Sequence, residues 1–392
     1  MFSDLLVIEL ASVLAGPSVG MFFAELGAEV IKIEHPRTGG DVTRSWKLPS
    51  EDINNDIPAY FSTVNWGKSS LALDVSTEEG KSILYALLKK ADLVIVSFKS
   101  GDAEKLKLDY KTLKELNPKL IYAAINAYGD NNPKTGYDAV LQAESGFMAM
   151  NGTPGSGPLK MPVALIDVIA AHHLKEGILL AYIKRLKTNE GSEVKVSLFE
   201  AALLSLANQA SNYLIAGYLP ELSGSLHPNI APYGETFLTK DQRHIILAIG
   251  NDRQFESLCQ VLHLPMEAKF ANNTLRINHR QELYYILSAV FKECNSDILM
   301  QDFDKHKIPA GLVASIEEAL NKPEAAKLIL EHLGKKGVSQ LSSGLRFQDK
   351  IGLPPHLGQN TKSILQEHLN ITSSQLKDLE YKHIILSKNI DG

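Results

Sequence analysis

Residues 5–34, LLVIELASVLAGPSVGMFFAELGAEVIKIE, decide the predicted fold. Leu5–Leu10 is a short apolar run bounded by polar residues, which predicts a buried strand. Ala15–Pro17 then turns the chain into a helix, and Gly27 is the stop signal of that helix. Val30–Glu34 predicts a second strand. This strand–helix–strand order is typical of a parallel sheet with helices on its faces.

The same alternation of strands and helices continues to about residue 200. Apolar runs predict further strands at Leu71–Val75, Leu93–Phe98, Leu120–Ile125 and Glu193–Leu198. Helices are expected at Ser76–Lys90, Tyr110–Leu116, Asp138–Met150 and Phe199–Tyr218, and the stretch Met161–Arg185 predicts another helix, with Asp167 at its entrance. A capping box at Ser76–Glu79 is expected to open the first of these helices. We therefore predict an α/β fold with a doubly wound, Rossmann-like parallel sheet.

The length of 392 residues favours two domains. The stretch LSGSLHPNIAPY at 222–233 indicates a linker, and beyond it the pattern predicts a strand at His244–Gly250 and helices at Arg253–Leu262 and His279–Cys294. The predicted large α/β domain comprises residues 1–221 and 330–392, with the C-terminal helices Thr361–Leu369 and Ser373–Leu379 packing back onto it. The other predicted parts are a linker at 222–231, a smaller α+β domain at 232–319 and the start of a return linker at 320–329.

The composition disfavours nucleic-acid-binding, membrane and disulfide-rich proteins. The net charge is −5 and no basic block occurs, so neither a nucleic-acid nor a membrane partner is expected. Cys259 and Cys294 provide no disulfide framework and fit a reducing compartment. The first ten residues lack the basic region of a signal peptide, and no apolar run reaches membrane-spanning length. These features predict a cytoplasmic enzyme or binding protein.

Asp167 is a single carboxylate inside the apolar run Val163–Ala171, at the start of a predicted helix of about twenty residues. An ionised carboxylate away from water is costly unless a partner satisfies it. One interpretation is an N-cap that accepts a hydrogen bond from a free helix amide. The other is a nucleophile that attacks an activated acyl group and carries it covalently. The stretch by itself is compatible with both.

Several common cofactor sites are disfavoured. Glu34 ends a second strand where a ribose-binding acid would lie, but Gly16–Gly20 lacks the G-x-G-x-x-G fingerprint, and Pro17 has no amide for a phosphate turn. The adjacent His172 and His173 point about 100° apart on a helix, so they do not form an i, i+4 zinc pair. No metal site, Walker A loop or serine nucleophile elbow is predicted.

A series of short motifs follows the chain almost to its C-terminus. They are Ala15–Pro17, Leu26–Glu34, Gly40–Arg44, Asn65–Asp74, Asn117–Pro118, Gly136–Asp138, Gln142–Gly146, Ile166–Asp167, Gly177–Leu179, Val194–Leu198, Ala248–Asp252 and Pro355–Thr361. In this order they resemble the class III coenzyme A-transferases. The resemblance covers nearly the whole sequence, whereas one such fragment would mean little.

The resemblance implies that Asp167 is the nucleophile. In that family the aspartate attacks an acyl-CoA to give an acyl-aspartyl anhydride, which CoA converts into an aspartyl-CoA thioester. A second carboxylic acid then reverses the steps and leaves as the new acyl-CoA. Coenzyme A and acyl-CoA are thus substrates, and no permanently bound cofactor is expected. The family's acids are small carboxylic acids, dicarboxylates among them. A glycine-containing lid is expected at Gly250 and Asn251.

By the same resemblance, particular positions are expected to contact CoA. They are Val13, His35, Arg37, Lys68, Ser97, Phe98 and Lys105. The chain departs from the family pattern at His35, often an arginine for which Arg37 is a substitute, and at Ser97 and Ser100. Arg44, Arg253 and His173 are alternatives for holding a second carboxylate of the substrate.

Two other functions are compatible with the sequence, and the resemblance also bears on the oligomeric state. Related α-methylacyl-CoA racemases pair the aspartate with a histidine, but Tyr137 stands at that position and is a poor base at neutral pH. A non-catalytic CoA-binding relative is the other alternative. The resemblance also implies an interlocked homodimer.

Overall fold

The computed structural model describes residues 1–130, 132–345 and 351–388. The chain forms two compact units. The first comprises Met1–Ser145, Met161–Ala207 and Ala326–Gly392, and the second comprises Gly146–Lys160 and Asn208–Ala325. The predicted large domain had included 146–160 and 208–221. Helix α10 (Ala207–Ala216) explains part of the difference, because it buries no residue and adds nothing to the core of the first unit.

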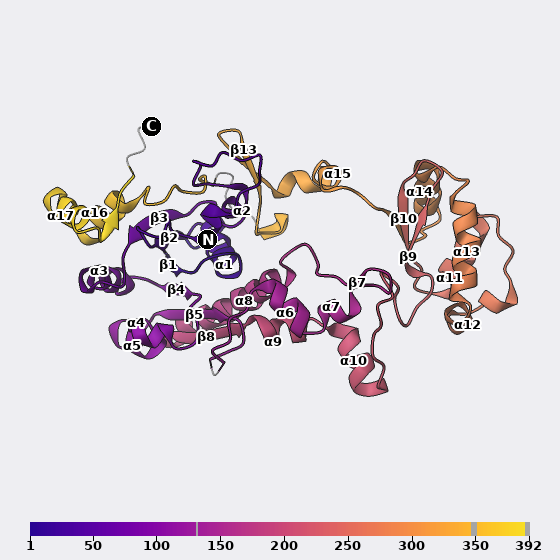
Figure 1. The fold of residues 1–392 in the computed structure, drawn as a ribbon, viewed down its shortest axis with the longest axis horizontal. Coiled ribbons are helices and arrows are strands. Elements are labelled where there is room, and N and C mark those ends of the chain that lie inside the picture. The colour runs from indigo at the N-terminus through magenta and orange to yellow at the C-terminus, as the bar shows by residue number, and fades with distance from the viewer. Residues whose placement is uncertain (131, 346–350, 389–392) are drawn as a thin grey trace. The chain divides into compact units, whose positions relative to one another are not determined.

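Within the described residues, the first unit contains a seven-stranded sheet (Figure 1). Its order is β14-β3-β2-β1-β4-β5-β8, and all pairs are parallel except β14 with β3. The strands are β1 (Leu6–Leu10), β2 (Glu29–Glu34), β3 (Ser69–Leu73), β4 (Leu93–Val96), β5 (Ile121–Asn126), β8 (Ser192–Ser197) and β14 (Ile385–Leu386). The order reverses between β1 and β4, which is the point where doubly wound sheets bind ligands.

Helices cover both faces of this sheet. One face packs α3 (Glu78–Leu88), α5 (Tyr110–Leu116), α16 (Thr361–Leu369) and α17 (Ser373–Tyr381) into a shared apolar core. On the other, α1 (Ala15–Glu25) packs against α8 (Leu165–Thr188), which also contacts β5, β8 and α9 (Leu198–Leu204). Because α16 and α17 share a core with α3, both ends of the chain build this unit.

Some predicted elements are placed differently in the structure. The helix expected at Asp138–Met150 is interrupted by Gly146, which has a φ of 91°, and divides into α6 (Asp138–Glu144) and α7 (Phe147–Met150). The helix expected at Phe199–Tyr218 divides into α9 and α10. The predicted capping box is also wrong by one residue, because Thr77 caps α3 while the hydroxyl of Ser76 bonds to Asp74.

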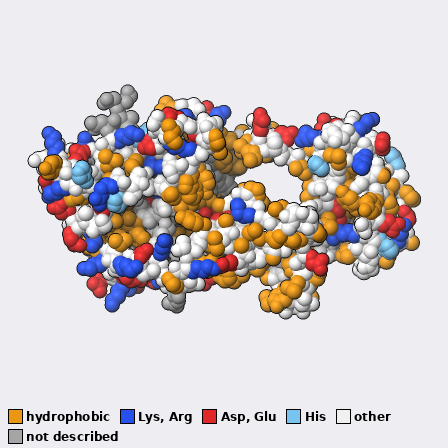
Figure 2. Space-filling view, viewed as in Figure 1, with side chains coloured by type: hydrophobic (Ala, Val, Ile, Leu, Met, Phe, Trp, Pro, Cys, Tyr) orange, Lys and Arg blue, Asp and Glu red, His pale blue; other side chains and the backbone are white. Residues whose placement is uncertain are grey.

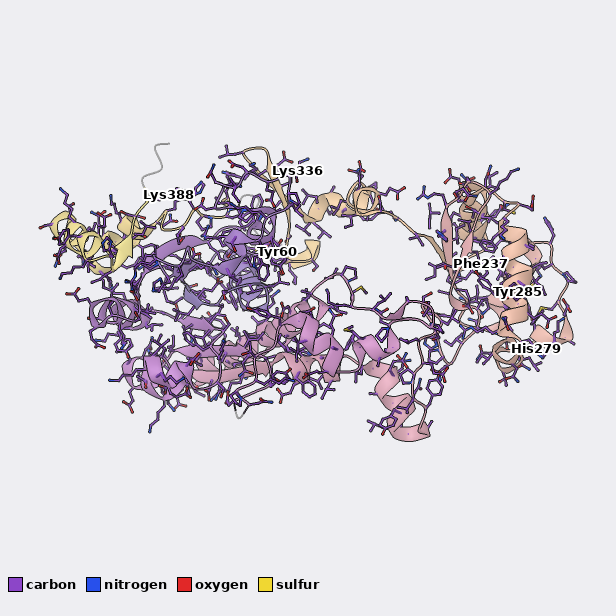
Figure 3. All side chains as sticks on the ribbon, in the orientation of Figure 1. Tyr60, Phe237, His279, Tyr285, Lys336 and Lys388 are labelled. Atoms are coloured by element: carbon purple, nitrogen blue, oxygen red, sulfur yellow. The ribbon has the colours of Figure 1, made fainter. Side chains whose placement is uncertain are left out.

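The second unit is built around the antiparallel sheet β11-β10-β9. Its strands and helices include β9 (Tyr233–Leu238), β10 (His244–Ala248), β11 (Ala310–Leu312), α11 (Asp252–Val261), α12 (Asn273–Asn278), α13 (Arg280–Phe291), α14 (Ser296–Lys305) and α15 (Ile316–Leu320). Phe237 lies inside this unit, stacked on Phe291 with ring centroids 4.6 Å apart, whereas Tyr285 lies on its surface (Figure 3). The sequence did not predict β9 or α14.

Smaller elements connect these helices and strands. They are α2 (Ala59–Ser62), α4 (Asp102–Leu106), the hairpin β6 (Gly152–Thr153) with β7 (Gly157–Pro158), and the hairpin β12 (Ile329–His332) with β13 (Lys335–Val338). Among the described residues, no helix is both long and apolar enough to cross a membrane.

Candidate active site

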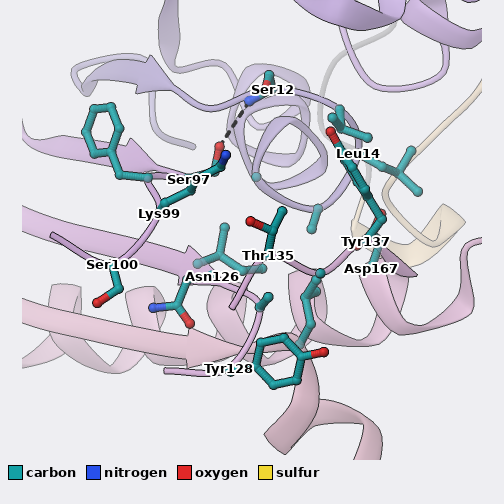
Figure 4. Close-up of a pocket in the computed structure, with 18 of the residues that line it drawn as sticks. Ser12, Leu14, Ser97, Lys99, Ser100, Asn126, Tyr128, Thr135, Tyr137 and Asp167 are labelled. Atoms are coloured by element: carbon teal, nitrogen blue, oxygen red, sulfur yellow. Dashed lines mark hydrogen bonds between the residues drawn. The ribbon is translucent and has the colours of Figure 1, made fainter. Parts of the chain in front are cut away.

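A cavity of about 370 Å³ opens at the carboxyl ends of β1, β4 and β5 (Figure 4). Its walls come from the turn Ser12–Gly16 after β1, Ser97–Ser100 after β4 and Ile125–Tyr128 at the end of β5. Asp167 and Tyr137 also line the cavity, on the side of α8 and α6. The cavity therefore lies at the switch point of the sheet, and the side chain singled out by the sequence faces it.

Asp167 lies in the first turn of α8, and its side chain does not cap the helix. The N-cap residue is Ala164, and the amide of Ile166 is bonded instead by Asp138 Oδ1 at 2.8 Å. The N-cap interpretation of Asp167 is therefore wrong. Among the described residues, no group donates a hydrogen bond to the Asp167 carboxylate, although the residue is only 8% exposed.

The surroundings of Asp167 favour its neutral form. Burial raises the pKa of Asp167, and the negative charge of Asp138 raises it further, to about 7. A carboxylate with this pKa is partly ionised at neutral pH, and none of the described residues donates a hydrogen bond to it. It is therefore suited to nucleophilic attack or to proton transfer.

The turn after β1 is held in an unusual conformation. Val13 has a φ of 74°, which is strained for a β-branched residue. Its amide donates to Asp41 Oδ1 at 3.3 Å, and the amide of Ser12 donates to Ser97 Oγ at 3.2 Å (Figure 4). These bonds come from segments distant in sequence, so the surrounding fold fixes the shape of this cavity wall.

Lys68 does not line the cavity. Its ammonium group donates to Glu9 Oε2 at 2.7 Å, to the carbonyl of Pro17 at 2.8 Å and to Asn65 Oδ1 at 3.0 Å. Burial lowers the pKa of Lys68 to about 8, although the neighbouring Glu9 opposes this shift. Lys32 donates to the other oxygen of Glu9 at 2.9 Å, so a buried network of charges lies beneath the turn.

The other residues predicted to contact CoA divide into two sets. Val13, Ser97 and Phe98 line the cavity, as does Ser100, whereas His35, Arg37 and Lys105 do not. Each of the latter three pairs with a carboxylate. His35 Nε2 lies 3.5 Å and Arg37 Nη2 lies 2.5 Å from Asp74, while Lys105 Nζ lies 3.0 Å from Asp102.

Two of the residues predicted as alternatives for holding a second carboxylate of the substrate do not line the cavity. Arg44 is buried, bonds both oxygens of Glu34 at 2.7–2.8 Å and lies 3.8 Å from the ring centroid of Phe61, so its charge is already used. His173 lies outside the cavity lining, with Nδ1 3.5 Å from Glu176.

The predicted lid residues belong to the second unit. Asn251 caps α11 by accepting the amide of Gln254 at 2.9 Å, and the amide of Gly250 donates to the side chain of Gln254. Arg253 follows in the same helix and is exposed.

The structure adds residues that the sequence did not single out. Lys99 and Lys134 are the cations among the described cavity-lining residues, and Lys134 lies over the ring of Tyr128 with its ammonium 5.1 Å from the centroid. The position of Lys99 directly after a predicted strand was a usable signal, because such positions face the ligand crevice. No cluster of three or more His, Cys, Asp or Glu side chains fit for a metal occurs in the described part of the chain.

Both the sequence and the fold are similar to those of known proteins. The model of CoA-transferase family III matches residues 2–361. The chain is 40% identical to the succinate–glutarate CoA-transferase of Agrobacterium fabrum, with 82% of each chain covered. It is 30% identical to the succinyl-CoA:glutarate CoA-transferase of Homo sapiens, covering 95% of this chain and 87% of the human one. A CaiB/BaiF family protein from Brucella suis has a similar solved structure, with a TM-score of 0.81, 36% identity, and coverage of 93% of this chain and 98% of that one.

Proposed function

Because the chain belongs to CoA-transferase family III, we propose that it transfers coenzyme A from succinyl-CoA to a small dicarboxylic acid such as glutarate. The observation that carries this proposal is the buried Asp167 carboxylate, which faces the cavity at the switch point without a hydrogen-bond donor among the described residues. The glutarate-using relatives support the choice of acids.

We propose a covalent route through Asp167. Its carboxylate attacks the thioester carbonyl, and CoA leaves as the thiolate while an acyl-aspartyl anhydride forms. The thiolate then attacks the aspartyl carbonyl, which releases the donor acid as a carboxylate and leaves an aspartyl-CoA thioester. The acceptor carboxylate attacks this thioester, expels the thiolate and forms a second anhydride. Attack of the thiolate on the acceptor carbonyl releases the new acyl-CoA and restores Asp167.

Both intermediates react with water, so the site must exclude it. We propose that Gly250 and Asn251 form part of a lid that closes over the bound acyl group. A Gly250→Ala variant tests this role, because a Cβ at that position meets only Gln254 Oε1 at 3.5 Å and folding is spared. The expected result is a higher ratio of thioester hydrolysis to transfer.

The residues predicted to contact CoA divide into those near its thioester end and those near its phosphates. We propose that Val13, Ser97 and Phe98 contact the thioester end of CoA inside the cavity, and that Lys99 supplies charge there. His35, Arg37 and Lys105 stay predictions for the distal phosphates, since CoA is longer than this cavity. Lys68 stabilises the turn after β1 and does not bind CoA in this proposal, because its three N–H groups donate to acceptors of the protein.

We also propose a homodimer, interlocked as the family resemblance implies. Figure 2 shows hydrophobic side chains gathered over α10, where Leu214 and Ile215 are 77% and 87% exposed. Such a face is costly in water and suits burial by a second copy. Light scattering of the purified protein tests the assembly, and a monomeric mass at micromolar concentration contradicts it.

The proposed activity is tested by supplying succinyl-CoA with a panel of acids and identifying new acyl-CoA products by mass spectrometry. Glutaryl-CoA formation by the wild type, absent in Asp167→Ala, is the expected result. Exchange of the α-proton of a 2-methylacyl-CoA with deuterium, without transfer, favours the racemase alternative. CoA binding without either reaction favours a non-catalytic relative.

A further inference from the structure

We propose that Asp138 and Gln142, one turn apart on α6, are positioning residues that form a clamp on residues 161–166. The clamp fixes the start of α8 and occupies the helix amide beside Asp167, so that the Asp167 carboxylate stays free to attack. This inference rests on the proposed function, since it concerns the efficiency of the same nucleophile.

Asp138 accepts a hydrogen bond from a free amide in the first turn of α8, where an acidic side chain of that turn, such as Asp167, would usually interact. An acidic residue in the first turn normally interacts with the free amides there. Here Asp138 Oδ1 accepts a hydrogen bond from the Ile166 amide at 2.8 Å. Asp138 itself is buried, with 6% of its surface exposed. The amide next to Asp167 is therefore satisfied by another helix, and the Asp167 carboxylate has no such bond among the described residues.

Gln142 holds the irregular segment that leads into α8. Its Oε1 accepts the amide of Met161 at 2.9 Å, and its Nε2 lies 2.6 Å from Asp138 Oδ2. The same Nε2 lies 3.3 Å from the carbonyl of Val163. The residue is 1% exposed. One amide group thus joins Asp138 to the backbone on both sides of residue 162, which leaves the start of α8 little freedom.

The clamp also brings a second negative charge close to Asp167. Asp138 and Tyr137 approach it from α6, and Tyr60 approaches from α2, where the charges of Asp167 and Asp138 add to burial in raising the pKa of the phenol. Lys99 and Lys134 line the same cavity farther along its wall. Asp138 therefore raises the basicity of Asp167 while its hydrogen bond keeps the helix in place, and a more basic carboxylate is a better nucleophile once ionised.

The two functions of the clamp separate in a pH profile of single-turnover adduct formation with succinyl-CoA. Asp138→Asn keeps an acceptor for the Ile166 amide, removes the charge and also removes the oxygen that accepts from Gln142 Nε2, so the acid limb and not the rate reports on the charge. We expect its acid limb to move down by about one pH unit. Gln142→Met removes the hydrogen bonds without changing charge, and we expect about a tenfold lower rate with the limb unmoved.

Asp109→Asn is the matched control. Asp109 also accepts a helix amide, from Thr112 at 3.0 Å at the start of α5, but unlike Asp138 it does not contribute to the raised pKa of Asp167. Its replacement is expected to leave both the rate and the acid limb unchanged. If Asp138→Asn does not fold, Asp138→Glu is tested in its place. Because this variant keeps the negative charge, its acid limb is expected to stay at the wild-type pH while the rate of adduct formation falls.

An unshifted limb in folded Asp138→Asn, or wild-type rates in folded Gln142→Met, overturns the clamp. These results differ from failure of the proposed function, in which the wild type itself forms no adduct. Thermal melting of each variant separates a loss of structure from a loss of positioning.

Discussion

Lys68 and Asp167 are both buried charged side chains of the first unit, but their surroundings are opposite. Lys68 donates to Glu9, Asn65 and a carbonyl, so its charge is fully used in holding the turn after β1. Asp167 has no donor among the described residues and lies beside another carboxylate. Buried charges are normally paired, and departures from that rule concentrate at functional sites. The contrast separates a charge that is paired within the protein from one that we propose is reactive.

The largest expected effect comes from removing the reactive charge. Asp167→Asn keeps the size of the side chain and removes the nucleophile, so transfer from succinyl-CoA to glutarate is expected to fall at least about 10³-fold. Steady-state assays of acyl-CoA products measure it. Transfer at a tenth of the wild-type rate contradicts the assignment.

Removing the structural charge is expected to affect folding instead. Lys68→Met leaves Glu9 without one partner in a buried place, which costs about 3–5 kcal/mol of stability. Urea unfolding of Lys68→Met and of Lys105→Met, whose ion pair is exposed, provides the comparison, with less than about 1 kcal/mol expected for the second. Equal effects of the two substitutions argue against a structural role for Lys68.

The raised pKa of Asp167 makes stability depend on pH. Between its ordinary pKa of 3.8 and about 7, the folded state binds more protons than the unfolded state, so this group's contribution to stability falls as pH rises. Asp167→Asn lacks this loss and is expected to be more stable than the wild type at pH 8, by on the order of 4 kcal/mol at most. The difference should disappear below about pH 4. Melting curves at several pH values check the sign, and a destabilised variant at pH 8 reverses it.

The smallest expected effect concerns the cations at the cavity. Lys99→Ala is expected to raise KM for acyl-CoA about tenfold with kcat little changed, because Lys99 lines the cavity that we propose holds the thioester end of CoA. Lys105→Ala, outside the cavity, is expected to change KM about twofold. The reverse order of these two variants would make the contact between Lys105 and the distal phosphates the stronger one.

The sequence predicted what local patterns determine. Alternating apolar runs located the parallel strands, and the motif order together with the apolar surroundings of Asp167 led to the prediction that Asp167 is the nucleophile. The partner of Lys68 was not accessible in this way, because Glu9 lies 59 residues away and only the fold brings them together. The bond from Asp138 to the Ile166 amide crosses 28 residues and was missed for the same reason. The helix breaks at Gly146 and Ala207 depend on positive φ values that a helical pattern does not reveal.

The central claim, that Asp167 carries the transferred group, is tested most directly by intact-protein mass spectrometry after brief incubation with succinyl-CoA. The wild type is expected to gain the mass of a CoA thioester, which hydroxylamine removes, and Asp167→Asn is expected to gain nothing. A CoA adduct of equal yield in both proteins would contradict the claim, as would efficient transfer by the wild type without any trapped adduct.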